Sequence, residues 1–378
     1  MQKPYGMRIV GIAAYVPPTV VTNDEVAQRL HAERDKVERH RRAIGAPTMT
    51  DDEKAAFDTN DRWIRRYIGF SERRFSGPNE GSIDLALRAS RRLLAGLHRS
   101  PCDIDGIVFA SVTPSFRHSP PDAALLQEAL GIPAWVDGRP REILGLDVAL
   151  ACCSWMAGLQ TAYRHLADAE RILLIGADRM STTINWRDRS FACVLGDAGT
   201  ATLCERVDPA DDWFGDNRFF SWIDGSKAMV IHTPVGGSRR PDLTSSDMES
   251  YRHCLTMDGR QVREDMVPFV SGPALDAMLA KAGLALDQLD LQVWHEANLV
   301  MNREVERRLR ERGFQGTTLD AGGRFGNTTS ASIPLALALN GVELKPGRTV
   351  ALVGYGGGYS YRSAIATIRH PISTFVEV

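Results

Sequence analysis

The chain has 378 residues, 43% of them hydrophobic and 24% charged, which is typical of a globular protein with two cores or one composite core. A formal net charge of −2 excludes the general positive field that binding to nucleic acid or an anionic membrane surface requires. No run of 18 apolar residues and no signal-peptide cleavage pattern occurs, so we expect a cytoplasmic protein without membrane contact. The six cysteines lack metal-ligand spacing, and we expect reduced thiols and no metal site.

Short apolar runs alternate with helical patterns in the first half of the chain. Strands are predicted at residues 8–16, 104–112, 142–150 and 170–178, and helices at residues 82–97 and 122–131 and directly after residue 150. The run 142–150, EILGLDVAL, is apolar enough to predict a buried strand. This alternation indicates parallel strands joined by crossover helices.

The second half of the chain repeats this order. The predicted elements are a strand at 291–298, a charged helix at 302–313, a small-residue helix at 330–339 and a strand at 349–358. The repetition indicates a duplicated α/β unit, in which each half covers a sheet face that the other leaves open. We divide the chain into residues 1–206, with an inserted helical segment near residues 24–57, and residues 207–378.

Three reactive or polar residues stand at the ends of predicted elements. Cys152, in LACCSWMAGL, lies at a strand-to-helix turn, where free N–H groups and the helix dipole favour a thiolate and can hold an oxyanion. His295 ends an apolar strand in WHEAN, and Asn327 lies in the glycine turn of GRFGNTTSASIP. Each alone is more often a packing or capping residue. Their joint occurrence in a duplicated sheet fold is what indicates a catalytic site.

Eight segments occur in an order that resembles one enzyme family. They are DRWIRRYIGFSERR, DVALACCSW, VLGDAGTA, TPVGGSRRP, MDGRQV, WHEAN, FGNTTSASIPLAL and GYGGGYSYRSAI. Over nearly its whole length the chain is similar to the β-ketoacyl-acyl carrier protein synthase III family of condensing enzymes. The resemblance implies an α/β thiolase-like fold, with two duplicated five-stranded mixed sheets in an αβαβα arrangement, and a homodimer.

The resemblance also implies a role for each candidate residue. Cys152 matches the nucleophile, which takes an acyl group from a thioester primer, and Cys153 occupies a small packing position. The N–H groups of Cys152 and Gly357 match the oxyanion hole. His295 and Asn327 match the donors that stabilise the enolate formed when malonyl-acyl carrier protein loses carbon dioxide. The implied product is a 3-oxoacyl-acyl carrier protein, made without a cofactor or metal.

Five further residues are expected to contact the substrate or its carrier. In the resemblance Trp63 and Asn298 match positions near the carrier channel, and Trp155 lies in a stretch expected to face the acyl pocket. Arg303 and Arg307 belong to a basic helix that can meet an acidic acyl carrier protein. The expected partners are therefore acyl carrier protein and acyl and malonyl thioesters.

The primer and the branch of the family are inferred from details of the match. Tyr67 and Val300 stand where the family usually has basic residues, which favours acyl carrier protein over coenzyme A as primer donor. The segments TINWRDRS, MDGRQV and HEANLVMN resemble the branch of β-ketodecanoyl synthases and secondary-metabolite ketosynthases. This branch implies a medium-chain acyl primer, in fatty acid or polyketide biosynthesis.

Other functions are compatible with a cysteine in this position. A related acyltransferase passes the acyl group to a hydroxyl or an amine. A chalcone-synthase-like polyketide former usually has proline in the C-terminal glycine loop, where this chain has GGG. A non-catalytic partner of another ketosynthase is expected to lack part of the catalytic set. The presence of both His295 and Asn327 favours decarboxylative condensation, which the release of carbon dioxide distinguishes from simple acyl transfer.

Overall fold

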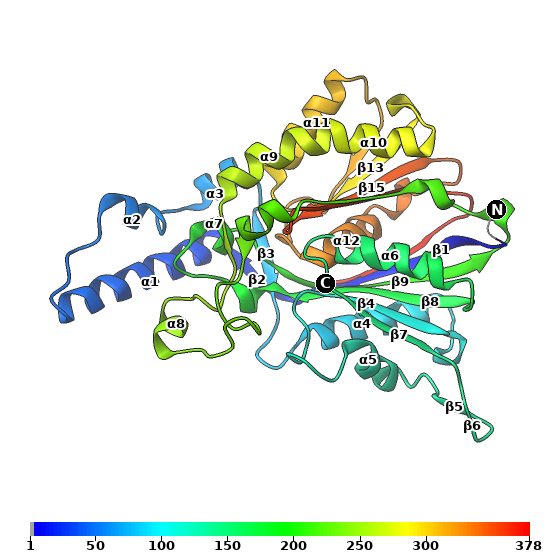
Figure 1. Ribbon diagram of the computed structural model, residues 1–378, viewed down its shortest axis with the longest axis horizontal. Helices are drawn as coiled ribbons and strands as arrows, with labels where there is room; N and C mark the ends of the chain where they lie inside the picture. Colours follow the sequence, from blue (N-terminus) through cyan, green and yellow to red (C-terminus); the bar gives the residue numbers. More distant parts are fainter. Residues whose placement is uncertain (1–3) are drawn as a thin grey trace.

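The computed structural model describes residues 4–378 and is built around two large mixed β-sheets (Figure 1). The first sheet contains, in order across it, β17 (Ser373–Glu377), β1 (Gly6–Tyr15), β9 (Asp197–Val207), β8 (Arg171–Arg179), β4 (Gly106–Ala110) and β7 (Leu144–Val148). The second contains β10 (Phe219–Ile223), β16 (Ser360–Thr367), β15 (Thr349–Gly356), β13 (Leu291–Trp294) and β14 (Thr317–Leu319). Short ribbons pair β2 (Thr19–Thr22) with β3 (Glu72–Phe75), β5 (Trp135–Val136) with β6 (Arg139–Pro140), and β11 (Ile231–His232) with β12 (Thr256–Met257).

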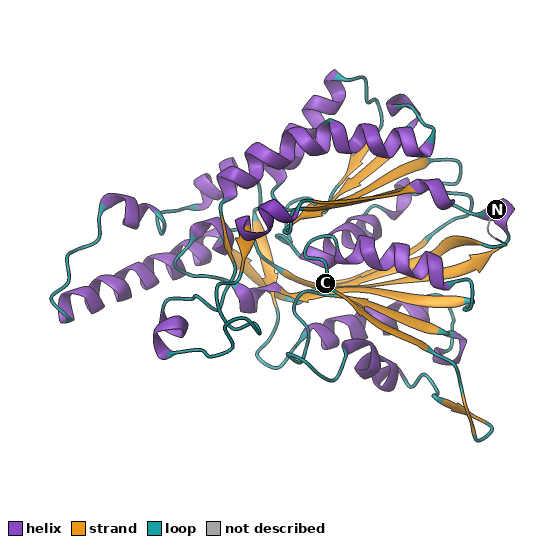
Figure 2. Cartoon of the chain, in the orientation of Figure 1, coloured by secondary structure: helices purple, strands orange, loops and turns teal. Residues whose placement is uncertain are grey.

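Helices cover the outer face of each sheet and fill the space between the sheets, which gives five layers (Figure 2). The outer helices are α4 (Ser82–Gly96) and α5 (Asp122–Leu130) on the first sheet, and α9 (Gly259–Ser271), α10 (Pro273–Ala282) and α11 (Leu299–Glu311) on the second. The central helices are α6 (Ser154–His165) and α12 (Ser332–Leu339). Nearly all of α12 is buried, whereas α11 buries one stripe at helical spacing, as a central and an outer helix require.

The two sheets have equivalent strand orders, which confirms the predicted duplication. The order β1, β9, β8, β4, β7 in the first sheet matches β10, β16, β15, β13, β14 in the second. In both sheets the last three strands are parallel to one another, and the preceding strands pair antiparallel. Helix α6 joins β7 to β8, and α12 joins β14 to β15, so the two central helices are equivalent crossovers.

Two features of the first sheet differ from the expectation. The sheet has a sixth strand, because β17 from the end of the chain pairs in parallel with β1. Strand β7 is an edge strand with alternating exposed residues rather than a buried one, because no strand within residues 4–378 pairs with its outer edge. We keep the division near residue 206 as a proposal, with the qualification that β17 returns to the first sheet.

The segment inserted near residues 24–57 is helical, as expected. It forms α1 (Asn23–Ala43) and α2 (Asp51–Ala55), which extend away from the sheets beside α8 (Ser245–Glu249) (Figure 1). The buried Arg73 attaches α1 to the body of the protein, because its guanidinium donates to the Asn23 side chain and to the Cys193 carbonyl. Within residues 4–378, no helix is both long and apolar enough to span a bilayer.

The two halves of the chain are locked together by a buried carboxylate. Asp178, at the end of β8, accepts hydrogen bonds from Ser111, Val112 and Thr113 of the first half. It also accepts the backbone N–H of Ser330 from the second half at 2.9 Å. Because a buried carboxylate is costly unless it is hydrogen-bonded, this contact fixes the position of the segment that leads into α12.

Candidate active site

A cavity of about 1320 Å³ opens between the two halves of the chain. Cys152 from the first half and Asn327 and Gly357 from the second half line it. Much of the remaining wall is apolar and includes four methionines, Met180, Met229, Met257 and Met301. Methionine is flexible and polarisable, so this wall can adapt to apolar chains of different shape. The cavity therefore places reactive groups beside space for an apolar ligand.

The backbone presents Cys152 at a tight turn between β7 and α6. The preceding residue, Ala151, has a φ of 45°, in the left-handed region that residues other than glycine rarely adopt. Helix α6 begins at Ser154 with Cys153 as its N-cap, and the Cys153 side chain is fully buried, as expected of a packing residue. Gly356 allows the loop after β15 to approach, because a Cβ there would lie 2.7 Å from the Cys152 sulfur.

The environment of Cys152 favours the neutral thiol. Burial raises the pKa of Cys152 to about 12, although the backbone N–H groups of Gly357 and of Cys152 itself act in the opposite direction. The expected thiolate is therefore wrong, because desolvation outweighs the effect of the N–H groups. The same two N–H groups come from different halves of the chain and converge on the sulfur. They are placed to stabilise an oxyanion that forms next to it.

His295 follows β13 and is fully buried beside Tyr355. The two rings pack edge to face with centroids 6.0 Å apart; Tyr355 lines the cavity, whereas His295 lies behind the lining residues. Burial lowers the pKa of His295 to about 3, so the imidazole is neutral at physiological pH. Its Nδ1 lies 2.6 Å from the Ser332 hydroxyl oxygen, and its Nε2 has no hydrogen-bond partner within residues 4–378.

The side chain of Asn327 is held in one orientation. Its Oδ1 accepts the backbone N–H of Thr329 at 2.8 Å, which leaves the Nδ2 amide as the group that can donate toward the cavity. Its backbone pairs with the first half of the chain, donating to the Val194 carbonyl and accepting from the Gly196 N–H. Asn327 precedes a 3₁₀ turn, and α12 itself begins only at Ser332.

Aromatic rings and a cation surround another part of the cavity wall. The ring centroid of Trp63, on α3 (Asp61–Tyr67), lies 4.4 Å from the guanidinium carbon of Arg189, on α7 (Arg189–Ala192). The Trp63 ring also packs against the ring of Tyr67. Asn298 also lines the cavity. Its side chain caps α11 by accepting two N–H groups and donates to the Tyr67 carbonyl at 3.1 Å, so it connects α11 to α3.

Several residues around the cavity were not predicted as site residues. Arg260 and Arg263, on α9, line the cavity beside the apolar wall. Arg189 and Arg260 belong to the segments TINWRDRS and MDGRQV, and Ser332 belongs to FGNTTSASIPLAL. The sequence signal was therefore present, but segment identity alone does not show which side chains face a cavity or a catalytic residue.

Three predicted contact residues are not among those that line the cavity. The Trp155 side chain is only 1% exposed and packs in the core between the sheets, against Gly176 of β8. Arg303 and Arg307 lie on the exposed side of α11. Arg307 is paired with glutamates three and four residues away on the same helix, so the basic face is largely neutralised.

Comparisons with known proteins agree on one family. Residues 279–368 match the profile of the 3-oxoacyl-[acyl-carrier-protein] synthase III C-terminal region, and residues 146–221 match that of 3-oxoacyl-[acyl-carrier-protein] synthase III. A β-ketoacyl-[acyl-carrier-protein] synthase III from Symbiobacterium thermophilum is 34% identical over 80% of this chain and 88% of its own length.

Solved structures give the same result. A 3-oxoacyl-(acyl-carrier protein) synthase from Burkholderia xenovorans has a TM-score of 0.79 and 28% identity, covering 100% of this chain and 98% of that one. The priming β-ketosynthase of the R1128 polyketide pathway has a TM-score of 0.77 and 25% identity, covering 98% of both chains.

A second buried titratable group, Glu296, lies next to His295. Its carboxylate accepts the backbone N–H of Ala321, and the side chain is 2% exposed. Burial raises the pKa of Glu296 to about 8, with a smaller contribution in the same direction from the charge of Asp320. The folded protein therefore retains a proton on Glu296 at neutral pH that the unfolded chain releases near its ordinary pKa of 4.5.

This difference predicts a pH-dependent stability. The contribution of Glu296 to the free energy of unfolding is fully present below about pH 4.5 and is lost by the time the pH has risen through about 8. Between these values the unfolded chain binds fewer protons at this residue than the folded protein does. Glu296→Gln should have little effect at pH 5.5 and raise the melting temperature by about 2–5 °C at pH 9. Melting curves of this variant and of the exposed control Glu249→Gln measure the difference. A Glu296→Gln effect of equal size at both pH values would contradict the assigned pKa.

Proposed function

The chain belongs to the β-ketoacyl-acyl carrier protein synthase III family, and we propose that its cavity carries out decarboxylative Claisen condensation. The substrates are an acyl thioester primer and malonyl-acyl carrier protein, and the product is a 3-oxoacyl-acyl carrier protein. One observation carries the proposal. Cys152 and Asn327 line a single cavity, with two backbone N–H groups converging on the cysteine sulfur.

In the first half-reaction Cys152 becomes acylated. Its sulfur attacks the primer carbonyl, and the N–H groups of Cys152 and Gly357 stabilise the oxyanion of the tetrahedral intermediate. When the intermediate collapses, the carrier leaves as a thiol, and the proton that Cys152 held at rest balances this step. The apolar cavity wall then accommodates the acyl chain.

In the second half-reaction malonyl-acyl carrier protein loses carbon dioxide. Asn327 Nδ2 and His295 Nε2 donate hydrogen bonds to the thioester oxygen as it becomes an enolate oxygen. The enolate carbon attacks the acyl-cysteine carbonyl, a carbon–carbon bond forms, and Cys152 leaves as a thiolate that is then protonated. The fixed orientation of Asn327, with Oδ1 already occupied, supports its role as a donor.

The hydroxyl of Ser332 can stabilise either neutral tautomer of His295, including the Nε2–H tautomer that the proposed enolate donor requires. It lies within hydrogen-bond distance of His295 Nδ1 and of the Thr329 carbonyl, but it has one hydrogen to donate. When it donates to Thr329, it accepts Nδ1–H, and Nε2 is a free proton acceptor. When it donates to Nδ1, the proton of the neutral ring is on Nε2, which becomes a donor for the enolate. Ser332 is thus a positioning residue for His295.

The surroundings of the cavity support acyl carrier protein as the partner. Arg263 lines the cavity and Arg189 lies over the ring of Trp63 beside it, so both can supply a cation for the phosphate of the pantetheine arm that carries the thioester. We place the enzyme in the cytoplasm, because all six cysteines are free thiols, as a reducing compartment maintains.

One prediction of the proposed function concerns the acylated residue. Cys152→Ala should abolish acyl loading, whereas Cys153→Ala should largely keep it, because Cys153 is buried away from the cavity. Intact-protein mass spectrometry after exposure to a panel of acyl thioesters measures the retained acyl mass, and peptide mapping locates it. Acylation that maps to Cys153, or that persists in Cys152→Ala, would overturn the assignment.

Another prediction concerns the groups that donate hydrogen bonds to the enolate oxygen. His295→Ala and Asn327→Ala should each slow condensation on the order of 10²-fold or more, the usual effect of losing an oxyanion donor. Ser332→Ala should slow it about tenfold, the effect of losing one hydrogen bond, while acyl loading changes less. Carbon dioxide release from malonyl-acyl carrier protein is the readout. Thr328→Val is the matched control, because the buried Thr328 hydroxyl has no hydrogen-bond partner in the described part of the chain.

If His295→Ala and Asn327→Ala released carbon dioxide at the parent rate, the proposed role of these residues would be wrong. The alternative acyltransferase activity would instead be established by a different set of results. The parent enzyme would load the acyl group and transfer it to an added alcohol or amine, and it would release no carbon dioxide.

We also propose that the enzyme is a homodimer that pairs through the edge of its first sheet. Strand β7 leaves one edge without a partner within residues 4–378, and an unpaired edge favours strand addition. Trp135 and Val136 of the β5–β6 hairpin, which precedes β7 in the chain, are 66% and 49% exposed. A twofold contact through β7 would cover this apolar surface.

Light scattering of the dilute protein tests this proposal, and a mass twice that of the chain is expected. Trp135→Glu should weaken the dimer if the β5–β6 hairpin belongs to the contact, whereas Ile223→Glu is a control at an exposed apolar residue of the second sheet. A fully active monomer would contradict the proposal.

A further inference from the structure

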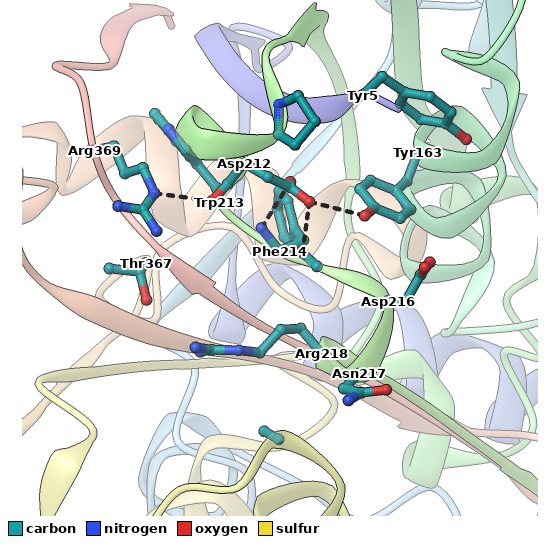
Figure 3. Close-up of a pocket in the computed structure, with 13 residues that line it drawn as sticks. Tyr5, Tyr163, Asp212, Trp213, Phe214, Asp216, Asn217, Arg218, Thr367 and Arg369 are labelled. Atoms are coloured by element: carbon teal, nitrogen blue, oxygen red, sulfur yellow. Dashed lines mark hydrogen bonds between the residues drawn. The ribbon is translucent and has the colours of Figure 1, made fainter. Parts of the chain in front are cut away.

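Figure 3 shows a second cavity, of about 460 Å³, which Cys152 does not line. Thr367, at the end of β16, lines it, whereas the start of β16 at Ser360 adjoins the Gly357 turn of the active site. From Ser360 to Thr367 the extended strand advances seven residue steps, a distance of about 23 Å. The second cavity is therefore separate from the catalytic one.

Two arginines that form no ion pair within residues 4–378 line this cavity. Arg218 ends the 3₁₀ turn before β10, and Arg369 follows β16. Within residues 4–378 neither forms an ion pair, and the only side-chain hydrogen bond of either is from Arg369 Nε to the Asp212 backbone carbonyl at 2.9 Å. The Nη1 atom of Arg218 is buried and has no hydrogen-bond partner among the described residues. Burying part of a guanidinium without a counter-ion or a full set of hydrogen bonds costs free energy, and a bound anion would offset that cost.

The charges of the two arginines act on each other. Burial, and next the charge of Arg369, hold the pKa of Arg218 below its usual value. Figure 3 shows the two side chains on the same side of the cavity, with the Thr367 side chain between them. A bound anion would relieve both the desolvation and the mutual repulsion.

The acidic side chains around the cavity are already occupied. The Asp212 carboxylate accepts hydrogen bonds from the Tyr163 hydroxyl and from three backbone N–H groups. Asp211 faces His370 at 3.6 Å, and Asp216 lies on the Tyr163 side of the cavity, away from Arg369 (Figure 3). Asp212 attracts Arg218 electrostatically, but its oxygens are used by these four donors.

We propose that this cavity binds the phosphate group of a small molecule, held by Arg218 and Arg369. The Thr367 hydroxyl and the Asn217 amide, which also line the cavity, add two neutral donors. Four donor groups around one space suit a phosphate with three or more acceptor oxygens better than a carboxylate with two. The cavity is larger than inorganic phosphate, and Tyr5 and Tyr163 line its remainder, so the ligand is a phosphate monoester.

The test uses the full-length enzyme at constant ionic strength with inorganic phosphate, glycerol 3-phosphate or acetate. Calorimetric titration measures binding of each compound, and melting curves measure its effect on the melting temperature. Both phosphate compounds should bind saturably and raise the melting temperature by about 2–4 °C at saturation. Arg218→Met and Arg369→Ala should abolish the shift. Arg206→Ala, at a surface arginine paired with Glu170, is the matched control and should keep it.

Two further measurements separate this site from a structural role and from the active site. Without phosphate, Arg218→Met should melt at or above the wild-type temperature, because it removes an uncompensated charge and keeps the side-chain volume. The phosphate response should persist in Arg263→Ala at the active-site cavity, and Arg218→Met should load acyl groups at the wild-type rate.

Four results would overturn the proposal. They are the absence of saturable phosphate binding, equal binding of acetate, a phosphate shift that survives in Arg218→Met, and a marked loss of stability in phosphate-free Arg218→Met. The last result would show that the arginine serves folding alone. None of these outcomes depends on whether the enzyme condenses or only transfers acyl groups.

Discussion

The buried carboxylate of Asp178 is the contact on which the geometry of the active site depends. It joins a loop of the first half of the chain to the N–H of Ser330 in the second half. Ser330 lies between Asn327 and Ser332, so this one hydrogen bond anchors the segment that carries the proposed enolate donor and the hydroxyl that contacts the His295 imidazole. Gly176 permits the approach, because a Cβ there would lie 2.6 Å from the Ser330 carbonyl. The site exists because the duplicated halves dock here.

Burial by the same docking sets the protonation of the reacting groups. Desolvation keeps Cys152 a thiol and His295 a neutral imidazole, so the resting site holds no ion pair between them. In the proposed mechanism charge develops on the substrate oxygen beside the N–H of Gly357 during loading and beside the Asn327 amide during decarboxylation, and on the Cys152 sulfur when it leaves. Because these donors are fixed by the fold before the substrate binds, they need no reorganisation when the charge appears.

Features set by local pattern could be predicted from the sequence, and contacts between distant segments could not. Cys152 and Asn327 each stand ahead of a central helix in a repeated unit, so both the duplication and the two residues were accessible. Trp155 was misplaced because α6 is buried on most sides, and helical spacing does not show which side faces a cavity. The neutralisation of Arg307 was visible, since glutamates lie three and four residues away. The return of β17 to the first sheet joins opposite ends of the chain, which no local pattern reveals.

The central claim is that a carbon nucleophile, produced by loss of carbon dioxide, attacks the acyl group on Cys152. A single turnover of the acylated enzyme with malonyl-acyl carrier protein labelled with ¹³C at carbon 2 tests it most directly. We predict that the labelled carbon becomes bonded to the former acyl carbonyl carbon, with one carbon dioxide released per product. Release of the acyl group on oxygen or nitrogen, with the malonyl group intact, would contradict the account.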